Sequence, residues 1–220
     1  MQPSDTSPTA EQPGKPGTSR ARGRPRAFDR DAALAQAMRL FWQKGFAATS
    51  MADLTQAMGI ASPSLYAAFG SKEALYAEAT DYYCATFGPA GWRGFLAADT
   101  AREAVQAWLM DAAALLSGGL GDVPLGCMVT LSAVGNEGNR ELGEMVRAGR
   151  AALVARLKER IDEGVASGEI GATVDTQALA RFLQVVQNGM SVQARDGVGC
   201  AELEAVARVA MFGWDGMVGA

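Results

Sequence analysis

The chain has 220 residues, enough for one large domain or two small ones, and 49% of them are hydrophobic, so it can form a sizeable core. No run of about 18 apolar residues occurs, and the first residues lack the apolar segment of a secretory signal, so we expect a cytoplasmic protein without a membrane partner. Histidine is absent and the three cysteines are far apart, which argues against an enzyme and predicts no metal or other cofactor.

The charge of the chain is distributed unevenly. The net charge is −4, but residues 1–80 carry nine Lys and Arg against seven Asp and Glu, whereas residues 81–220 carry eleven against seventeen. Residues 15–26 contain five basic residues and no acidic one. This asymmetry favours nucleic acid as the partner of the N-terminal part. Because residues 1–27 also contain five of the eight prolines, we expect them to form a flexible basic arm.

Helical patterns begin directly after this arm. Asp29 has the position of an N-cap, and apolar residues follow it at helical spacing. Ser50 and Asp53 have the spacing of a capping box at the start of a second helix. Ser62 directly precedes Pro63, which predicts Ser62 as the N-cap of a third, very short helix.

The first three helices fit within about 45 residues, and a tight glycine turn joins the second to the third, which is the arrangement of a helix-turn-helix domain. We therefore assign residues 28–74 to an N-terminal three-helix DNA-binding domain. Ser71 is predicted to cap a fourth helix that begins at Lys72 and runs into the 80s.

The remaining residues, 75–220, also show helical periodicity. The glycines and the proline of Phe87–Leu96 predict a hinge or linker after the fourth helix. Further helices are predicted over about 99–117, 125–134, 139–167, 176–194 and 201–214. No segment alternates as a strand does, so we predict an all-α protein with a C-terminal helical bundle.

Two segments, GRPRAFD (23–29) and GFAATSMADLTQAMGIASPSLYAAFGSKEALY (45–76), closely resemble the DNA-binding region of the TetR/AcrR family of repressors. Gly126-Cys127 and residues 187–197 also look like segments of AcrR-type members. The resemblance implies a homodimer whose two third helices enter the major groove of a double-stranded DNA operator. It further implies that the C-terminal domain dimerises through its last two helices and binds a small-molecule effector, which releases the operator.

The candidates for DNA contact come from the arm, from the start of the second helix, and from the third and fourth helices: they are Arg24, Arg26, Thr49, Ser50, Ser62, Pro63, Ser64, Tyr66, Ala67 and Lys72. The two arginines flank a proline that keeps the arm extended, a shape that enters a narrow minor groove or follows phosphates loosely. The resemblance implies phosphate contacts for the pair before the second helix, for the tyrosine and for the lysine; the alternatives are helix capping, a core tyrosine and a surface lysine. The small side chains of the third helix allow close approach to bases.

The candidates for a ligand cavity are mostly methionines and large apolar residues, with one glutamine: Trp108, Met110, Leu115, Cys127, Met128, Met145, Phe182, Val186, Gln187 and Met190. The alternative for each is an ordinary place in the helical core. Their composition suits a mostly apolar effector that a few hydrogen bonds fix in place. Cys127 is expected near a helix start, where a thiol can serve as a redox or electrophile sensor; the alternative is inert packing.

The last two helical patterns carry broad apolar stripes. The candidates for a dimer interface are Leu179, Phe182, Leu183, Leu203, Val206, Val209, Ala210 and Met211. Two adjacent helices with such faces near a terminus usually need a partner. Burial within one chain is the alternative explanation for part of the pattern.

We therefore predict a homodimeric transcriptional repressor that a small-molecule effector releases from its operator, without catalysis. The first alternative is an activator or a ligand-independent DNA-binding protein of the same fold. The others are a ligand-binding enzyme with Glu or Lys chemistry, which paired buried carboxylates in the cavity would indicate, and a purely structural helical protein.

Overall fold

The computed structural model describes residues 29–119 and 121–218, and in these residues all regular structure is helical, as predicted. The helices are α1 (Arg30–Lys44), α2 (Met51–Met58), α3 (Ser62–Phe69), α4 (Lys72–Ala97), α5 (Ala101–Leu116), α6 (Met128–Leu131), α7 (Arg140–Ser167), α8 (Thr176–Arg195) and α9 (Cys200–Met217). Within these described ranges, no helix is both long enough and apolar enough to cross a membrane.

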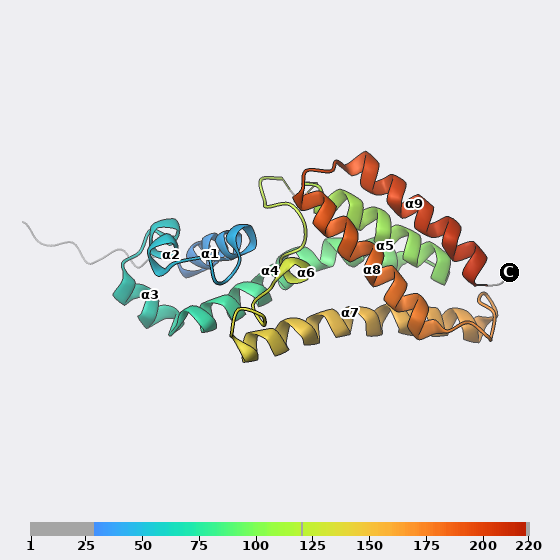
Figure 1. Cartoon of the computed structure of the whole chain (residues 1–220), viewed down its shortest axis with the longest axis horizontal. Helices are drawn as coiled ribbons and strands as arrows, with labels where there is room; N and C mark the ends of the chain where they lie inside the picture. Colours follow the sequence, from blue (N-terminus) through green and yellow to red (C-terminus); the bar gives the residue numbers. More distant parts are fainter. Residues whose placement is uncertain (1–28, 120, 219–220) are drawn as a thin grey trace, which may run out of the picture.

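The helices form an elongated molecule with a small group of helices at one end (Figure 1). Helices α1, α2 and α3, which we call the head, gather there together with the start of α4. Helix α4 then runs away from the head and packs against α5. Helices α5, α8 and α9 pack together at the opposite end, and α7 extends along one side, in contact with α4, α5, α6 and α8.

Local side-chain chemistry starts most of the head helices as expected. The Asp29 side chain accepts hydrogen bonds from two main-chain N–H groups of α1. The capping box of Ser50 and Asp53 is complete in α2, and Ser71 caps α4. The prediction for Ser62 is wrong, because Ala61 is the N-cap of α3. The Ala61 carbonyl accepts hydrogen bonds from the N–H groups of residues 64 and 65, so the helix begins one residue earlier than predicted.

The predicted hinge at Phe87–Leu96 does not exist, because α4 continues through it. Close packing between α4 and α5 explains one of the three glycines in this segment, Gly94. A Cβ atom on Gly94 would lie 2.8 Å from the Cβ atom of Ala107 in α5, which is closer than two non-bonded carbon atoms approach in a packed core. Pro89 removes one backbone donor from α4, but it lies on the exposed side of the helix. Tertiary packing here overrides the local preference of glycine and proline.

The helix predicted over 125–134 shortens to α6, which has four residues. Gly126 has a positive φ of +76°, and a Cβ atom there would lie 2.7 Å from the Ser191 carbonyl oxygen of α8. The chain therefore crosses α8 closely before α6 begins. Arg150 of α7 donates hydrogen bonds to the carbonyl oxygens of Val129, Thr130 and Ser132. These carbonyl oxygens are thus held by a side chain.

Two hydrophobic clusters form the interior. One contains the buried residues of α1, α2, α3 and the first part of α4, together with four residues from α6, α7 and the loop between them. The other contains residues of α5, α8 and α9 and the second half of α7. Residue 75, at which the C-terminal domain was predicted to begin, lies inside α4, where Leu75 and Tyr76 are buried in the head cluster. The head is therefore joined to the rest of the chain by shared core packing.

Candidate functional site

The outer face of α3 is free of other parts of the described chain. Leu65 and Phe69 are buried and hold the helix on the head, whereas Ser62, Pro63, Ser64 and Ala67 are exposed. The side chain of Tyr66 is also on this face, with 50% of its surface exposed. The alternative of a core tyrosine is thereby removed. An eight-residue helix with a small, exposed outer face can fit a DNA major groove.

The two residues before α2 have different surroundings. Thr49 is fully buried, and its hydroxyl donates a 2.6 Å hydrogen bond to the carbonyl oxygen of Gly45. Its hydroxyl is therefore not placed to contact a phosphate, and it does not cap α2 either. Ser50 is exposed, and its hydroxyl oxygen accepts the hydrogen bond of the Asp53 main-chain N–H. Of these two residues, only Ser50 is therefore accessible to a phosphate.

Lys72 begins α4 directly after the cap of Ser71. Its ammonium nitrogen lies 4.3 Å from the centre of the Phe46 ring, and the side chain is half-buried. The stacked contact holds the charge next to the head instead of leaving it free in solvent. The predicted arm residues Arg24 and Arg26 lie outside the described residues.

A cavity of about 830 Å³ lies behind the head. Helices α4, α5, α7 and α8 supply most of its wall, α6 and the segment before it supply a smaller part, and Trp42 reaches it from α1. Exposed residues on α4 and α7, including Asp81 and Arg156, are among its lining, so it opens to the surface between these helices. In the described chain, Asp81 is the only carboxylate in this lining, so the paired buried carboxylates of the enzyme alternative are not found there.

Five of the ten predicted cavity residues lie on this wall: Trp108, Leu115, Cys127, Met145 and Gln187. The other five lie elsewhere. Met128 and Met190 are buried in the two hydrophobic clusters, and Val186 packs on the second of them. Met110 lines a smaller surface pocket between α5 and α9. Phe182 is exposed on the surface of α8. Periodicity selected these side chains as inward-facing, but it does not distinguish a filled core from a cavity wall.

Four of the five aromatic side chains of the cavity were not predicted from the sequence; the fifth is Trp108. Tyr83, Phe87 and Trp92 of α4 line it, together with Trp42. The rings of Trp42 and Tyr83 meet edge to face with their centres 4.9 Å apart. Phe87 and Trp92 belong to the predicted hinge or linker, and Tyr83 lies just before it. Trp42 fits the core pattern of α1. No local signal indicated that the four lie on one wall.

Cys127 is the N-cap of α6, as its predicted place at a helix start requires. Its main-chain N–H donates to the Ser191 hydroxyl at 2.8 Å, and its sulfur accepts a hydrogen bond from the Tyr83 hydroxyl at 3.4 Å. Cys84 lines the same cavity. Although Cys84 is an exposed residue, partial desolvation raises the pKa of its thiol, and the neighbouring Cys127 raises it further. This environment favours the unreactive thiol form of Cys84.

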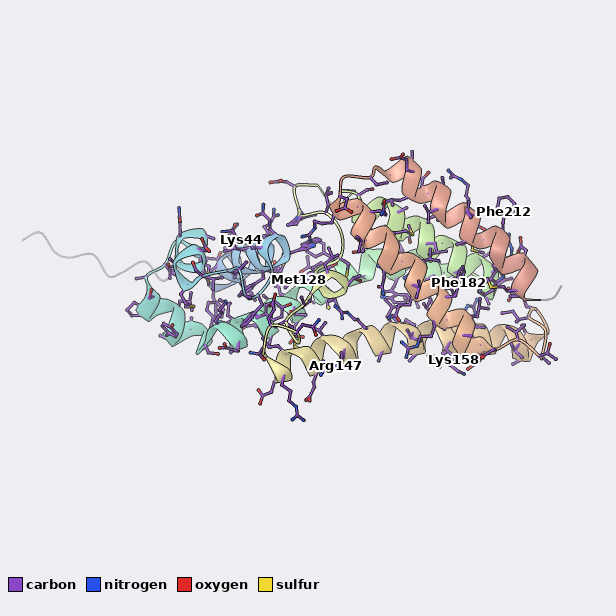
Figure 2. The ribbon with its side chains drawn as sticks, viewed as in Figure 1. Lys44, Met128, Arg147, Lys158, Phe182 and Phe212 are labelled. Carbon is purple, nitrogen blue, oxygen red and sulfur yellow. The ribbon has the colours of Figure 1, made fainter. Side chains whose placement is uncertain are left out.

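The last two helices bury part of the predicted dimer surface in the chain's own core. Leu179, Leu183, Leu203, Ala210 and Met211 are buried, so their assignment to a surface that faces a partner is corrected. The exposed apolar residues of α8 and α9 are Phe182, Val185, Val192, Val206, Val209, Phe212 and Met217. Figure 2 marks Phe182 on α8 and Phe212 on α9. The helix pair therefore does carry exposed apolar residues, but most of them differ from the predicted ones.

A capped three-helix head with an exposed third helix, joined to a helical body that contains a large cavity, defines a helix-turn-helix transcription regulator. The comparisons with known proteins agree. Residues 33–79 match the family described as bacterial regulatory proteins, tetR family. The transcriptional repressor ComR of Escherichia coli (strain K12) is 33% identical over 202 residues, which cover 90% of this chain and 95% of ComR. The chain belongs to the TetR family of DNA-binding transcriptional regulators.

Two further relatives are similar over different lengths. The repressor BdcR of the same organism is 50% identical over 68 residues, which is 31% of this chain and 34% of BdcR. A cysteine mutant of the TetR family regulator CifR, solved in complex with a 26-base-pair operator DNA, is 40% identical with a TM-score of 0.79. That match covers 86% of this chain and 98% of the CifR chain.

Proposed function

We propose that this protein is a homodimeric repressor that binds operator DNA through its head and releases it when a small, mostly apolar molecule enters the cavity. In this proposal residues 28–74 bind DNA, residues 75–220 bind the effector and dimerise, and no reaction is catalysed. The observation that carries the proposal is the position of Trp42, a residue of the head that is also part of the cavity wall. Two relatives, ComR and BdcR, are named as repressors.

The DNA-binding part of the proposal rests on exposed groups around α3. Ser62, Ser64 and Ala67 are small and exposed, so the helix can approach base edges closely. Tyr66 and Lys72 lie on α3 and at the start of α4, where a hydroxyl and a cation suit phosphate oxygens. The basic arm with Arg24 and Arg26 adds further phosphate or minor-groove contacts. The CifR chain was solved with operator DNA, which supports this use of the fold.

The dimer part rests on the exposed apolar face of α8 and α9. Val185, Val209 and Phe212 expose 66%, 68% and 79% of their surface. Gly189 in α8 and Gly213 and Gly216 in α9 lie among these residues in the sequence and let a partner helix approach closely. Leaving such a face in water is unfavourable for a single chain, and a second copy would cover it.

The way in which the head is attached supports the release step of this proposal. The end of α1 is held by Arg195 of α8, and the Ala47 main-chain N–H donates a 3.1 Å hydrogen bond to Glu137 in the loop before α7. The first contact comes from α8, which also supplies part of the cavity wall. A molecule that displaces Trp42 or these neighbours would therefore tilt the head, which changes the separation of the two α3 helices in a dimer.

The test is the binding of the full-length protein to its own upstream DNA, followed by fluorescence anisotropy over a range of salt concentrations. The wild type is expected to bind with a steep salt dependence. Lys72→Gln is expected to weaken binding and to reduce the log–log salt slope by about 0.9, the value for one phosphate contact. Lys158→Gln is the matched control, because Lys158 lies on α7 far from the head (Figure 2) and pairs with Asp162.

The outcomes separate the parts of the proposal. Salt-dependent binding that one member of a panel of apolar compounds relieves would support a ligand-released repressor. Binding that no compound alters would favour a ligand-independent DNA-binding protein. An unchanged salt slope in Lys72→Gln would show that Lys72 makes no phosphate contact.

A further inference from the structure

The wall of the cavity is mostly apolar and contains a group of aromatic side chains. Five aromatic residues line it, and two of them, Trp92 and Trp108, are stacked with their ring centres 6.0 Å apart. Trp42 and Tyr83 supply an edge-to-face pair. Aromatic side chains of this kind pack well against the faces and edges of a flat aromatic ligand. The surface chemistry of the wall therefore favours a ligand with an aromatic body.

The charged groups of the wall are already engaged or lie at its exposed side. The Arg150 guanidinium donates to three main-chain carbonyl oxygens. The Arg156 guanidinium lies 4.7 Å from the centre of the Trp92 ring, and both Arg156 and Asp81 are exposed. Among the residues described, Arg150 is the one charged group of this wall that is not exposed, and its Nε and Nη2 are already used to hold these carbonyl oxygens. An ionised ligand would lose hydration without full compensation.

Two uncharged polar atoms of the wall are, by contrast, left without partners. The indole Nε1 of Trp42 and the amide Oε1 of Gln187 are shielded from solvent and have no hydrogen-bond partner in the described part of the chain. The two residues expose only 4% and 6% of their surface. The other polar side chains nearby are satisfied: the Gln184 amide nitrogen donates to the Arg150 carbonyl oxygen, and the Thr130 hydroxyl donates to Asn188. An unpaired buried polar atom is costly unless something binds it.

We propose that the cavity takes an uncharged aromatic molecule with a hydroxyl group, such as a phenol, that hydrogen-bonds to the Gln187 amide and the Trp42 indole. The indole N–H can only donate, so it requires an acceptor on the ligand. A hydroxyl group both donates and accepts, so it pairs with the Gln187 amide oxygen and suits the indole as well. The Gln187 amide turns about a soft terminal torsion, so its oxygen can adjust its direction toward such a group.

This inference depends on the proposed function only in calling the ligand an effector, because binding is measured without DNA. Full-length protein is titrated by calorimetry with naphthalene, 2-methoxynaphthalene, 2-naphthol and 2-naphthoate. We expect 2-naphthol to bind about tenfold or more tightly than naphthalene, since it satisfies buried polar groups. 2-Methoxynaphthalene, which only accepts, should fall between them, and the carboxylate should bind most weakly.

Two variants locate the effect. Gln187→Met keeps the length of the side chain but removes its polar end, and Trp42→Phe keeps a ring but removes the N–H donor. Each should reduce the advantage of 2-naphthol over naphthalene, while Gln177→Met, an exposed change on the same helix, should leave it unchanged. Should Trp42→Phe weaken the fold of the head, Gln187→Met alone decides.

The proposal is overturned if naphthalene and 2-naphthol bind equally, if 2-naphthoate binds best, if no compound binds, or if Gln187→Met keeps the full preference. Release of operator DNA is measured separately with the same compounds. Binding of 2-naphthol that leaves DNA binding unaffected would contradict the repressor mechanism but not the ligand class.

Discussion

The guanidinium of Arg195, at the last residue of α8, donates a hydrogen bond from Nη2 to the carbonyl oxygen of Trp42, 3.0 Å away. The same side chain donates from Nε to Leu125 at 2.8 Å and from Nη1 to Gln43 at 3.4 Å. The carbonyl groups at the end of α1 lie at the negative end of the helix dipole, where a cation is favourable. Partial burial lowers the pKa of Arg195, but a guanidinium stays charged. One side chain thus joins α8, the segment before α6 and the head.

Replacing Arg195 by Met should loosen the head. The loss of these charge-assisted hydrogen bonds is expected to destabilise the protein by about 2 kcal/mol, or roughly 4–8 °C in Tm for a chain of this size. Hydrogen exchange should accelerate most at the end of α1 and in the loop after it. Arg208→Met, which removes only an exposed ion pair to Glu204 on α9, is the control and should change little. Unaltered exchange in α1 would show that Arg195 does not hold the head.

The two glycines Gly88 and Gly94 in α4 should respond to alanine in opposite directions. At Gly94 the added methyl group would lie 2.8 Å from the Ala107 Cβ atom, so α4 and α5 must separate. A destabilisation of about 1–3 kcal/mol is expected from this overpacking. At Gly88 no described atom lies within 4 Å of the new methyl group, and the better helix propensity of alanine should stabilise the protein by up to about 1 kcal/mol. Thermal unfolding of both variants measures the difference, and equal shifts would refute the packing argument.

Phe212→Glu should separate the proposed dimer. Phe212 has 79% of its surface exposed on α9, so the change places a charge in a partner-facing position without disturbing the core. Sedimentation velocity should show a monomer at concentrations where the wild type is a dimer. Leu96→Glu is the matched control, because Leu96 is also an exposed apolar residue, at 65%, but lies on α4. If the dimer persists in Phe212→Glu but is lost in Leu96→Glu, the interface would lie on α4 instead of α9.

The Asp53 carboxyl group in the capping box of α2 should have an unusually low pKa. The hydrogen bond from the Ser50 main-chain N–H, and then that of the Ser50 side chain, lower the pKa of Asp53 to about 2, with a smaller contribution from Lys44. Because the folded pKa is depressed, the ionised cap stabilises the head above the ordinary pKa near 3.8 and loses this contribution as the pH falls to about 2. An NMR titration of the Asp53 carboxyl group should show this midpoint. In Lys44→Met the midpoint should rise slightly but stay well below 3.8; a return to the ordinary value would assign the shift to the lysine instead.

The features that could be read from the sequence were those set by local chemistry. Asp29, Ser50 and Ser71 cap helices through contacts with residues only two or three positions away, and such contacts are visible in the spacing of residue types. The all-helical class followed from the periodicity of apolar residues in the same way. The predicted start of α3 was wrong by one residue. The first turn is set by hydrogen bonds to the Ala61 carbonyl oxygen, and a main-chain group of this kind does not depend on the type of side chain.

The features that were missed depend on contacts between distant residues. Glycine and proline predicted a break in α4, but the packing of Gly94 against Ala107 requires a residue without a side chain there. The apolar stripe of α8 is wide enough to face two ways, so the sequence could not show that Leu183 is buried while Val185 is exposed. The cavity wall has the same origin, since it joins residues of α1, α4, α7 and α8 whose proximity only the fold creates.

Trp42 contributes to two structures at once, the core of the head and the wall of the cavity. Thermodynamic linkage between two ligands is reciprocal, so a molecule that weakens DNA binding by some factor is itself bound more weakly to the DNA complex by the same factor. The operator would then act as an antagonist of its own inducer. A promoter that is already occupied would respond only at a higher concentration of the molecule than free protein needs to bind it, and this difference would set the threshold of the genetic switch.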